Sequence, residues 1–329
     1  MCDRRIPDEF AAGHYTPVAA LAGALASSRL PDDLISDPRI YQDIRDGELV
    51  WVRLAWLKSF IKTVLPRVRG RFVLVTGDSD TCVPSELAED ARAILDSPNV
   101  VHWFTQNYDG SPAPEKISPV PIGLDFHMLS QRPIWGEKIA TPEEQERTLR
   151  AIAQELPPLH KRVPRVYIDF AWQRSWGLRS YRRFHPLQGA ALRESRRKIV
   201  KTLQNRDGVF CQTVSLPRNE MWRRRGEYAF VLSPHGTGLD CHRTWEALAL
   251  GHIVLTPSSS LNQLYEGLPV IPLTSWDEIT PENLRRWLAA AAQGERFHPQ
   301  LTSNYWIEKM RATARNAVSH LESDSRVAG

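Results

Sequence analysis

Short apolar runs alternate with helical patterns along much of the chain, and this alternation limits the possible folds more than any other feature. Arg71–Thr76 is a β-branched apolar run that ends at Gly77, which is typical of a buried strand in a parallel sheet. Residues 85–95 then have helical spacing, and Asn99–Phe104 and Val120–Ile122 predict further strands. Strand, helix and strand in this order indicate an open α/β domain.

A second alternation of the same kind occupies the other half of the chain. Strands are predicted at Val163–Ile168, Val209–Val214, Tyr228–Leu232, His252–Leu255 and Pro269–Leu273, with helices at Gln188–Leu203, Cys241–Leu250 and Asn304–Leu321. Between the halves, Thr141 and Pro142 open a capped helix that Pro157 ends. We therefore predict an α/β protein of two Rossmann-like domains, residues 1–155 and 156–329, which face each other across a cleft. The last helix closes the chain.

The stretch from Tyr228 to Thr256 has the densest set of ligand-binding signals. A predicted strand runs into a glycine-containing loop, and a helix follows at once. The loop positions of interest are Ser233, His235, Gly236, Gly238 and the predicted helix cap Asp240. A glycine turn at the carboxyl end of a parallel strand, followed by a helix N-terminus, favours binding of a phosphate.

Helical spacing separates two faces of the helix that follows this loop. Cys241, Trp245 and Leu248 share the face that should pack on the sheet, whereas Arg243 and Glu246 lie on the other. An arginine in the first turn opposes the helix dipole, and a bound diphosphate would offset that cost. A carboxylate one turn further on suits the two hydroxyls of a ribose. The alternative is an ordinary exposed ion pair between Arg243 and Glu246.

Residues 233–248, together with Gly251 and Leu264–Glu266, resemble the exostosin-like glycosyltransferases, and the soluble bacterial members of that group most closely. The clear resemblance covers about residues 209–280 and includes Ser215–Met221. Weaker matches occur at Trp103–Asn107 and Pro119–Leu124.

The resemblance implies the GT-B architecture and a nucleotide sugar, linked to UDP or GDP, as the donor substrate in the second domain. Arg243 would then hold the diphosphate and Glu246 the ribose. The implied reaction is an inverting, single-displacement transfer of a sugar to a glycan or lipid-linked acceptor in surface polysaccharide synthesis. No cofactor or metal ion is implied.

Three residues are candidates for the general base that deprotonates the acceptor hydroxyl. Asp78 and Asp80 follow a predicted strand, and His127 follows Gly123-Leu124-Asp125 at another strand end. Asp78-Ser79-Asp80 also imitates a metal-binding DxD motif, although the same letters are frequent in plain turns. Because the second half is expected to bind the donor without a metal, we assign the aspartates to the acceptor side.

Composition excludes several other classes of protein. Lys plus Arg exceeds Asp plus Glu by only 42 − 38 = 4, which suits anionic ligands but not a protein that coats nucleic acid. The four cysteines are far apart, so neither a disulfide scaffold nor a structural zinc site is expected. No run of 18 apolar residues occurs, and Val18–Ala26 is interpreted as a surface helix. We expect a cytoplasmic protein.

Three arginine-rich runs leave a second function open. They lie at Arg179–Arg183, Arg193–Lys198 and Arg223–Arg225. The alternative to an enzyme is a non-catalytic protein that binds anionic glycans or nucleic acid through these helices. Because acidic residues interleave and no nucleic-acid motif is present, we favour solvated helix faces and expect no nucleic-acid partner. Some of these arginines are predicted to contact an anionic acceptor or the membrane surface.

Overall fold

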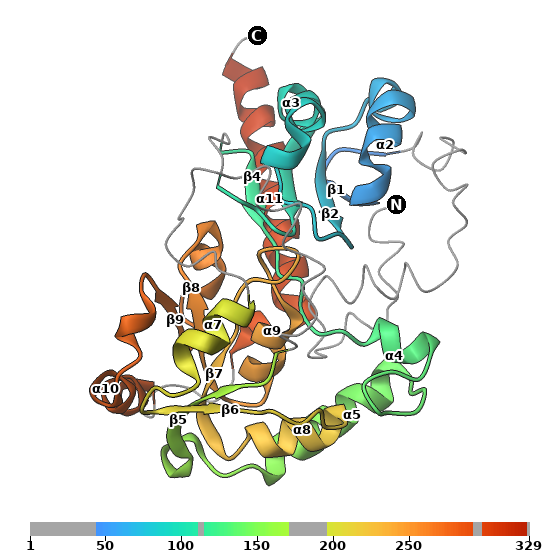
Figure 1. Ribbon diagram of the computed structural model, residues 1–329. Coiled ribbons are helices and arrows are strands. Elements are labelled where there is room, and N and C mark those ends of the chain that lie inside the picture. Colours follow the sequence, from blue (N-terminus) through green and yellow to red (C-terminus); the bar gives the residue numbers. More distant parts are fainter. Residues whose placement is uncertain (1–43, 111–114, 171–195, 292–297, 328–329) are drawn as a thin grey trace. The chain divides into compact units, whose positions relative to one another are not determined.

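The structure is a computed structural model that describes residues 44–110, 115–170, 196–291 and 298–327 (Figure 1). The chain separates into two units. Unit 1 comprises Met1–Ile122 and Thr302–Gly329, and unit 2 comprises Gly123–Leu301. The helix expected at Val18–Ala26 and the arginines of 179–183 lie outside the described residues.

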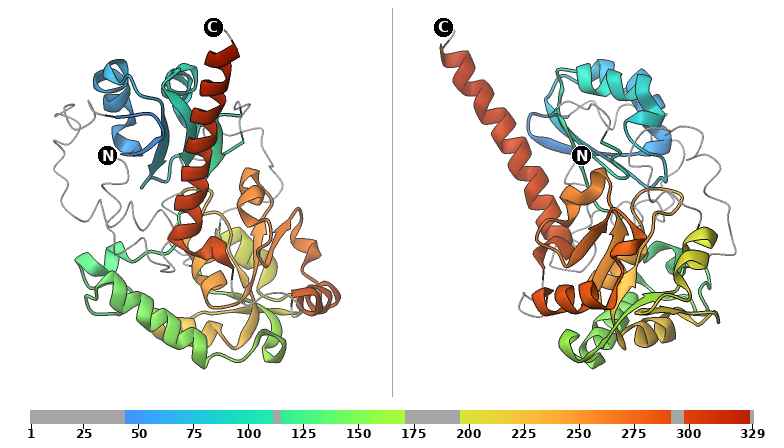
Figure 2. Two further views of the ribbon diagram at one scale, coloured as in Figure 1. Left: turned by 180° about the vertical axis from the view of Figure 1, so that it is seen from behind. Right: turned by 60° about the vertical axis from the view of Figure 1, so that its left-hand side comes forward.

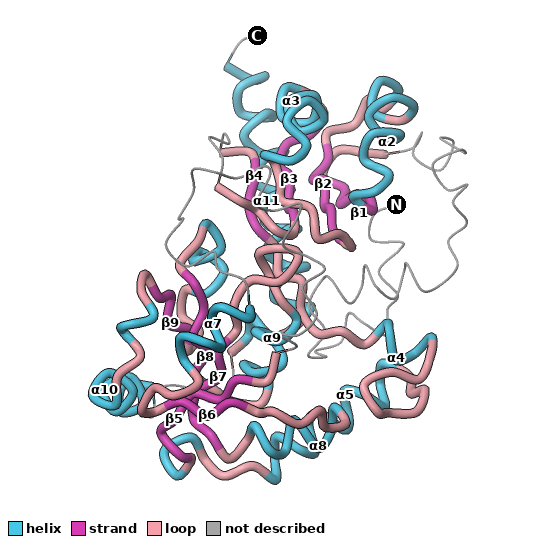
Figure 3. The backbone as a smooth tube through the Cα atoms, viewed as in Figure 1, coloured by secondary structure: helices cyan, strands magenta, loops and turns pink. Residues whose placement is uncertain are grey.

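Unit 1 contains a four-stranded parallel sheet in the order β1-β2-β3-β4 (Figure 3). Its strands are β1 (Glu48–Arg53), β2 (Phe72–Gly77), β3 (Val100–Thr105) and β4 (Ile117–Pro119). Its helices are α2 (Leu57–Thr63), α3 (Ala88–Asp96) and α11 (Ser303–Val327), with short 3-10 turns at Leu54–Trp56, Leu65–Arg67 and Ser85–Leu87. Helix α11 packs on β1, β2 and β3, and α2 and α3 lie on the other face (Figure 2).

Unit 2 contains a five-stranded parallel sheet in the order β6-β5-β7-β8-β9 (Figure 3). The strands are β5 (Val163–Ile168), β6 (Val209–Cys211), β7 (Tyr228–Leu232), β8 (Ile253–Pro257) and β9 (Val270–Leu273). The helices are α4 (His127–Gln131), α5 (Pro142–Glu155), α7 (Arg196–Leu203), α8 (Arg218–Arg225), α9 (His242–Ala249) and α10 (Pro281–Ala291). Short 3-10 turns occupy Leu159–Lys161, Ser260–Tyr265, Trp276–Glu278 and Pro299–Leu301.

The strand order of unit 2 reverses direction at one place. From β5 the chain moves outward to β6, returns to the other side of β5 as β7, and continues in that direction to β9. A parallel sheet with this order has a topological switch point between its first and third strands, which are β5 and β7 here. Ligands of open α/β sheets bind outside the carboxyl ends of such strands, so the switch point indicates where to look for a site.

Helices cover both faces of this sheet. One face packs on α7 and α10, through Ile199, Leu203 and Leu284 among others. Helix α5 packs on both α8 and α9. Because right-handed crossovers put helices on opposite faces when the strand order reverses, α8 and α9 lie on the face opposite α7. Residues at the carboxyl ends of β5 and β7 are therefore enclosed by elements from both layers.

The predicted α/β class, with two parallel sheets, is confirmed. The structure divides the chain at a different place from the predicted boundary between residues 155 and 156. Segment 127–155 belongs to unit 2 because α5 packs on α8 and α9, and α11 belongs to unit 1 because it packs on that unit's sheet. The GT-B arrangement across a cleft stays a prediction.

Individual elements differ from the prediction mainly at their ends. The strand expected at Val120–Ile122 lies three residues earlier as β4, and the strand expected at Val209–Val214 ends at Cys211. Strand β1 was not predicted. Among the described residues, no helix is long and apolar enough to cross a membrane.

Candidate functional site

The carboxyl ends of β5 and β7 bring together a cluster of charged side chains at the switch point of unit 2. Asp169 and Phe170 directly follow β5, whereas the glycine loop follows β7 and leads into α9. Arg196, the first described residue of α7, lies against this loop. A Cβ atom at Gly236 would lie 3.2 Å from Nη2 of Arg196 and 3.0 Å from Sγ of Cys241. A side chain at this position would therefore press on both neighbours, whereas glycine lets them approach the backbone closely.

Two of the arginines lie over the same aromatic ring. The guanidinium carbon of Arg243 is 5.6 Å from the centre of the Phe170 ring, and that of Arg196 is 5.7 Å away. Burial, and then the like charge of Arg243, lower the pKa of Arg196. Within the described residues, no carboxylate lies at ion-pair distance from Arg196. The cluster thus holds two neighbouring cations, an arrangement that favours a bound anion.

One buried carboxylate is shared between two arginines behind this pair. The Arg243 Nε donates to Asp169 Oδ1 at 2.9 Å, and the Arg225 Nη2 donates to Asp169 Oδ2 at 2.5 Å. Burial alone would raise the pKa of Asp169, but the charges and hydrogen bonds of Arg225 and Arg243 bring it below its usual value. Asp169 is therefore a carboxylate anion, and it neutralises only part of the charge of its two partners.

Glu246 lies at the other end of this cluster. Its Oε2 atom is 3.5 Å from Nη1 of Arg225, and its side chain is 13% exposed. The ion pair between Arg243 and Glu246 that was weighed from the sequence does not form, because Arg243 turns to Asp169 instead. Spacing correctly predicted that Arg243 and Glu246 share one side of α9, opposite the buried Trp245.

The other predicted residues of the loop stabilise the loop itself. Ser233 is buried and its hydroxyl pairs with that of Thr244 at 2.8 Å. The His235 Nδ1 lies 2.8 Å from the Leu239 carbonyl oxygen. The Gly236 N–H donates to the Gly238 carbonyl at 3.0 Å, so this amide is directed into the loop and not outward.

The prediction that Asp240 caps the helix is wrong. The N-cap residue of α9 is Cys241, and its side chain makes no capping hydrogen bond. The Asp240 carboxylate instead accepts from the Cys241 N–H at 2.8 Å and from the Trp245 indole at 2.9 Å. Because the buried indole N–H needs an acceptor, this aspartate is committed to holding the loop against α9.

The candidates for the general base fall into two different units. In unit 1, Asp78 follows β2 with φ of 58° and pairs with Nε of Arg53 at 2.6 Å. Asp80 is exposed. The structure does not bring a metal-binding group together there: no cluster of three or more His, Cys, Asp or Glu suited to a metal ion occurs within the described ranges.

In unit 2, His127 opens α4 and pairs with the carboxylate of Asp125. Its Nδ1 lies 2.9 Å from Asp125 Oδ1. Burial alone would raise the pKa of Asp125, but the hydrogen bond to His127 and the charges of His242 and His127 bring it below its usual value. The His242 Nδ1, at the start of α9, lies 2.6 Å from the Gly123 carbonyl oxygen. The segment that carries His127 is therefore attached to the helix that carries Arg243.

Helix α8 does not form an open basic face. Arg218 and Arg225 are buried, Arg223 pairs with Glu155 at 3.4 Å, and Arg224 pairs with Glu227 at 2.9 Å. Sequence reasoning could not separate buried arginines from solvated ones here, because α8 has no clear apolar stripe.

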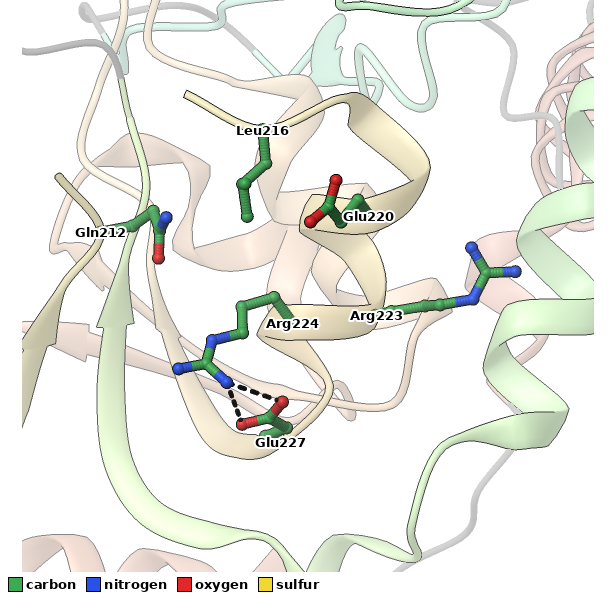
Figure 4. Close-up of a pocket in the computed structure, with 6 residues that line it drawn as sticks. All are labelled: Gln212, Leu216, Glu220, Arg223, Arg224 and Glu227. Atoms are coloured by element: carbon green, nitrogen blue, oxygen red, sulfur yellow. Dashed lines mark hydrogen bonds and ion pairs between the residues drawn. The ribbon is translucent and has the colours of Figure 1, made fainter. Parts of the chain in front are cut away.

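A cavity of about 460 Å³ lies beside α8, away from the residues of the switch point. It is lined by Gln212, Leu216, Glu220, Arg223, Arg224 and Glu227 (Figure 4). Figure 4 shows both carboxylate oxygens of Glu227 bonded to the Arg224 guanidinium. Its two arginines are thus each paired with a carboxylate, whereas Arg196 beside Phe170 has no carboxylate at ion-pair distance among the described residues.

Sequence reasoning missed Asp169, Arg196 and Arg225. Asp169 follows a predicted strand, which is the signal that could have found it, whereas Arg196 and Arg225 lie within arginine-rich runs that gave no sign of which members are buried.

No protein-family model matches the sequence, and a search of curated proteins finds no match. Among solved structures, the chain is similar to an alpha-glucosyltransferase in complex with UDP and a 13-mer DNA containing a central A:G mismatch. The two chains are 10% identical, the match covers 87% of this chain and 79% of the other, and the TM-score is 0.29. A likeness this weak does not decide the fold or the activity of this chain.

Proposed function

We propose that unit 2 binds the diphosphate of a nucleotide sugar and that the protein is a glycosyltransferase. The observation that carries this proposal is the pair of arginines, Arg196 and Arg243, over Phe170 at the topological switch point. Within the described residues the two Nη nitrogens of Arg243 make no hydrogen bond or ion pair. They are suited to donate to phosphate oxygens in the bidentate way that guanidinium groups favour.

The resemblance of residues 233–248 to the exostosin-like glycosyltransferases supports a sugar nucleotide over another diphosphate. Glu246 lies one turn beyond Arg243 and keeps part of its side chain exposed, as a ligand of ribose hydroxyls requires. Positive charge from Arg196 and Arg243 would stabilise the departing nucleoside diphosphate during transfer. We propose an inverting course in which a base activates a hydroxyl of a glycan or lipid-linked acceptor.

We assign the base to His127 in preference to Asp78 and Asp80. An imidazole whose Nδ1 is held by a carboxylate has a fixed tautomer, and the proton from the acceptor then goes to Nε2. The 2.9 Å contact with Asp125 supplies this arrangement. Asp78 is bound to Arg53, and Asp80 is exposed to solvent.

Ligand-dependent stabilisation tests the donor site. UDP or GDP should raise the melting temperature of the protein, because a ligand that binds only the native state stabilises it. Arg243→Gln should make the shift clearly smaller. Arg224→Gln is the matched control, since it removes an exposed arginine of the same unit that pairs with Glu227. A protein that responds to heparin or DNA but to neither nucleotide would instead be the anionic-polymer binder considered from the sequence.

A further inference from the structure

Four charged side chains of unit 2 form a chain of alternating sign. Arg243 bonds to Asp169 at 2.9 Å, Asp169 bonds to Arg225 at 2.5 Å, and Arg225 lies 3.5 Å from Glu246. They come from the end of β5, the last turn of α8 and the first two turns of α9. These four side chains therefore link three elements that are far apart in sequence.

Among these four side chains, the two in the middle of the row are more deeply buried than the two at its ends. The side chains of Asp169 and Arg225 are 2% and 1% exposed, whereas those of Arg243 and Glu246 are 18% and 13% exposed. The two ends are the residues that the proposed function brings to the diphosphate and the ribose. The two buried members have no access to a ligand, so any influence they have on binding must act through the ends.

Stability alone is a weak reason for such a buried pair. Removing charges from water costs free energy that the ion pair often only offsets, so an apolar pair of similar volume would serve the core as well. The geometry offers another reason. A free arginine side chain samples many rotamers, and the bond from its Nε to Asp169 fixes the direction of the guanidinium plane over Phe170.

We infer that Asp169 is a positioning residue, which acts through Arg243 and, by way of Arg225, is linked to Glu246. The inference rests on the proposed function, since it assumes that Arg243 holds a diphosphate. It predicts a change in nucleotide affinity opposite to the one expected from charge alone. Removing a carboxylate near an anion site should strengthen anion binding if charge alone matters, whereas removal of a positioning residue should weaken it.

A double-mutant cycle separates these two possibilities. The affinities of UDP and GDP are measured by calorimetry for the parent, Asp169→Asn, Arg243→Gln and the double variant. We expect Asp169→Asn to weaken binding about tenfold in the parent and to change nothing further once Arg243 is replaced. Asp277→Asn is the matched control, because it removes an 85% exposed carboxylate of the same unit that pairs with Arg206.

Two results would overturn the inference. One is that Asp169→Asn binds the nucleotides as tightly as the parent or more tightly. The other is an equal loss with and without Arg243, since a merely structural role would act in both backgrounds. If the parent itself binds neither nucleotide, the proposed function is wrong and the inference fails with it. That outcome is distinct from a parent that binds while Asp169→Asn has no effect.

A second variant covers the case in which Asp169→Asn does not fold. Arg243→Lys keeps the charge and leaves Asp169 with two cationic partners. A lysine has one ammonium group and no separate nitrogen for each partner, so Asp169 would hold it away from the ligand. We expect Arg243→Lys to bind as poorly as Arg243→Gln. An affinity within about twofold of the parent would mean that charge suffices and would overturn the inference.

Discussion

The carboxyl ends of the two parallel sheets carry similar residues but use them differently. In unit 1, Asp78 pairs with Arg53, and its backbone N–H donates to the Gln106 side chain at 2.8 Å. The described strands of that sheet follow one another in sequence order, so they contain no switch point. In unit 2, the order reverses at β5 and β7, and Asp169 is shared by two arginines. Arg196 lies nearby, and no carboxylate of the described residues is at ion-pair distance from it.

The difference is one of charge balance. The polar groups at the end of β2 satisfy one another, as a plain turn does, whereas those at the ends of β5 and β7 leave an excess of positive charge beside a glycine loop. A sequence that resembles a motif, such as Asp78-Ser79-Asp80, can thus belong to an ordinary turn that bonds to neighbouring side chains. A site without an obvious motif can be assembled by strand order, which is a property of the fold and not of any short segment.

The largest effect on stability is expected from replacing a buried tryptophan in either unit. Trp103 in β3 donates to Thr76, and Trp245 in α9 donates to Asp240, and both are fully buried. Replacing either by alanine should cost about 3–5 kcal/mol of unfolding free energy. Only Trp245→Ala should also weaken nucleotide binding at temperatures where it is folded, because Asp240 then loses the indole. Denaturant titration and calorimetry measure the two effects, and equal loss of binding in both variants would contradict the comparison.

Acid should lower the stability of unit 1 through His102. Burial and the charges of Lys309 and Lys116 lower the pKa of His102 in unit 1 from 6.5 to about 4. The unfolded chain then binds a proton that the folded chain does not, so stability is lost as the pH falls from about 6.5 towards 4. The full loss is ~3 kcal/mol at about 1.4 kcal/mol per pKa unit.

His102→Gln removes this titration and can keep a bond to Ser118, which the imidazole approaches at 2.9 Å. Its melting temperature should therefore fall less between pH 6.5 and 4 than that of the parent. A remaining decrease is expected from His252 in unit 2, because burial and then the charge of Arg162 lower its pKa well below 6.5. In unit 2, Asp125 and Asp169 have lowered pKa values, so their stabilisation is present above the ordinary carboxyl range and is lost only below it. Parent and variant curves of equal slope would show that His102 has no part in the response.

A smaller effect is expected from Glu246→Gln. The substitution keeps the shape but removes the charge that suits two ribose hydroxyls, so UDP or GDP affinity should fall about tenfold, or ~1.4 kcal/mol. Asp78→Asn in unit 1 should leave that affinity unchanged. Calorimetric titration of both variants tests the contrast between unit 1 and unit 2. If Glu246→Gln binds as well as the parent, the carboxylate does not contact the ribose.

The smallest effect, none at all, is expected from removal of metal ions. Arg196 and Arg243 already supply positive charge for a diphosphate, so nucleotide affinity should be the same in EDTA as in manganese or magnesium. A strict requirement for the metal would show that Asp78-Ser79-Asp80, or another group, binds one, and would contradict the assignment of the donor site.

Local patterns predicted the elements of this fold well, because periodicity and caps act over short distances. Thr141 and Glu144 form the capping box expected of the helix that became α5, and Trp245 is buried as its spacing implied. The two faces of α9 were predictable for the same reason. The domain boundary was not, because α5 and α11 join their units through packing that no local signal records.

The partners of the charged residues could not be predicted either. Asp169 meets Arg225 and Arg243 across 56 and 74 positions of the chain. Each of these arginines has several carboxylates nearby in sequence, and only the strand order decides which of them it reaches. The choice of Arg243 as a ligand contact came from its place in the first turn of α9. Its buried support became visible only in three dimensions.

The path of the chain through the two units has a consequence for synthesis. Unit 2 is one continuous segment, Gly123–Leu301, whereas unit 1 is completed by Thr302–Gly329. Helix α11 brings Trp306, Ile307 and Met310 to the core of unit 1, and all three are buried. A ribosome releases these side chains after the whole of unit 2, and domains fold as units while the chain emerges. Unit 2 can therefore reach its native state while unit 1 still waits for helix α11.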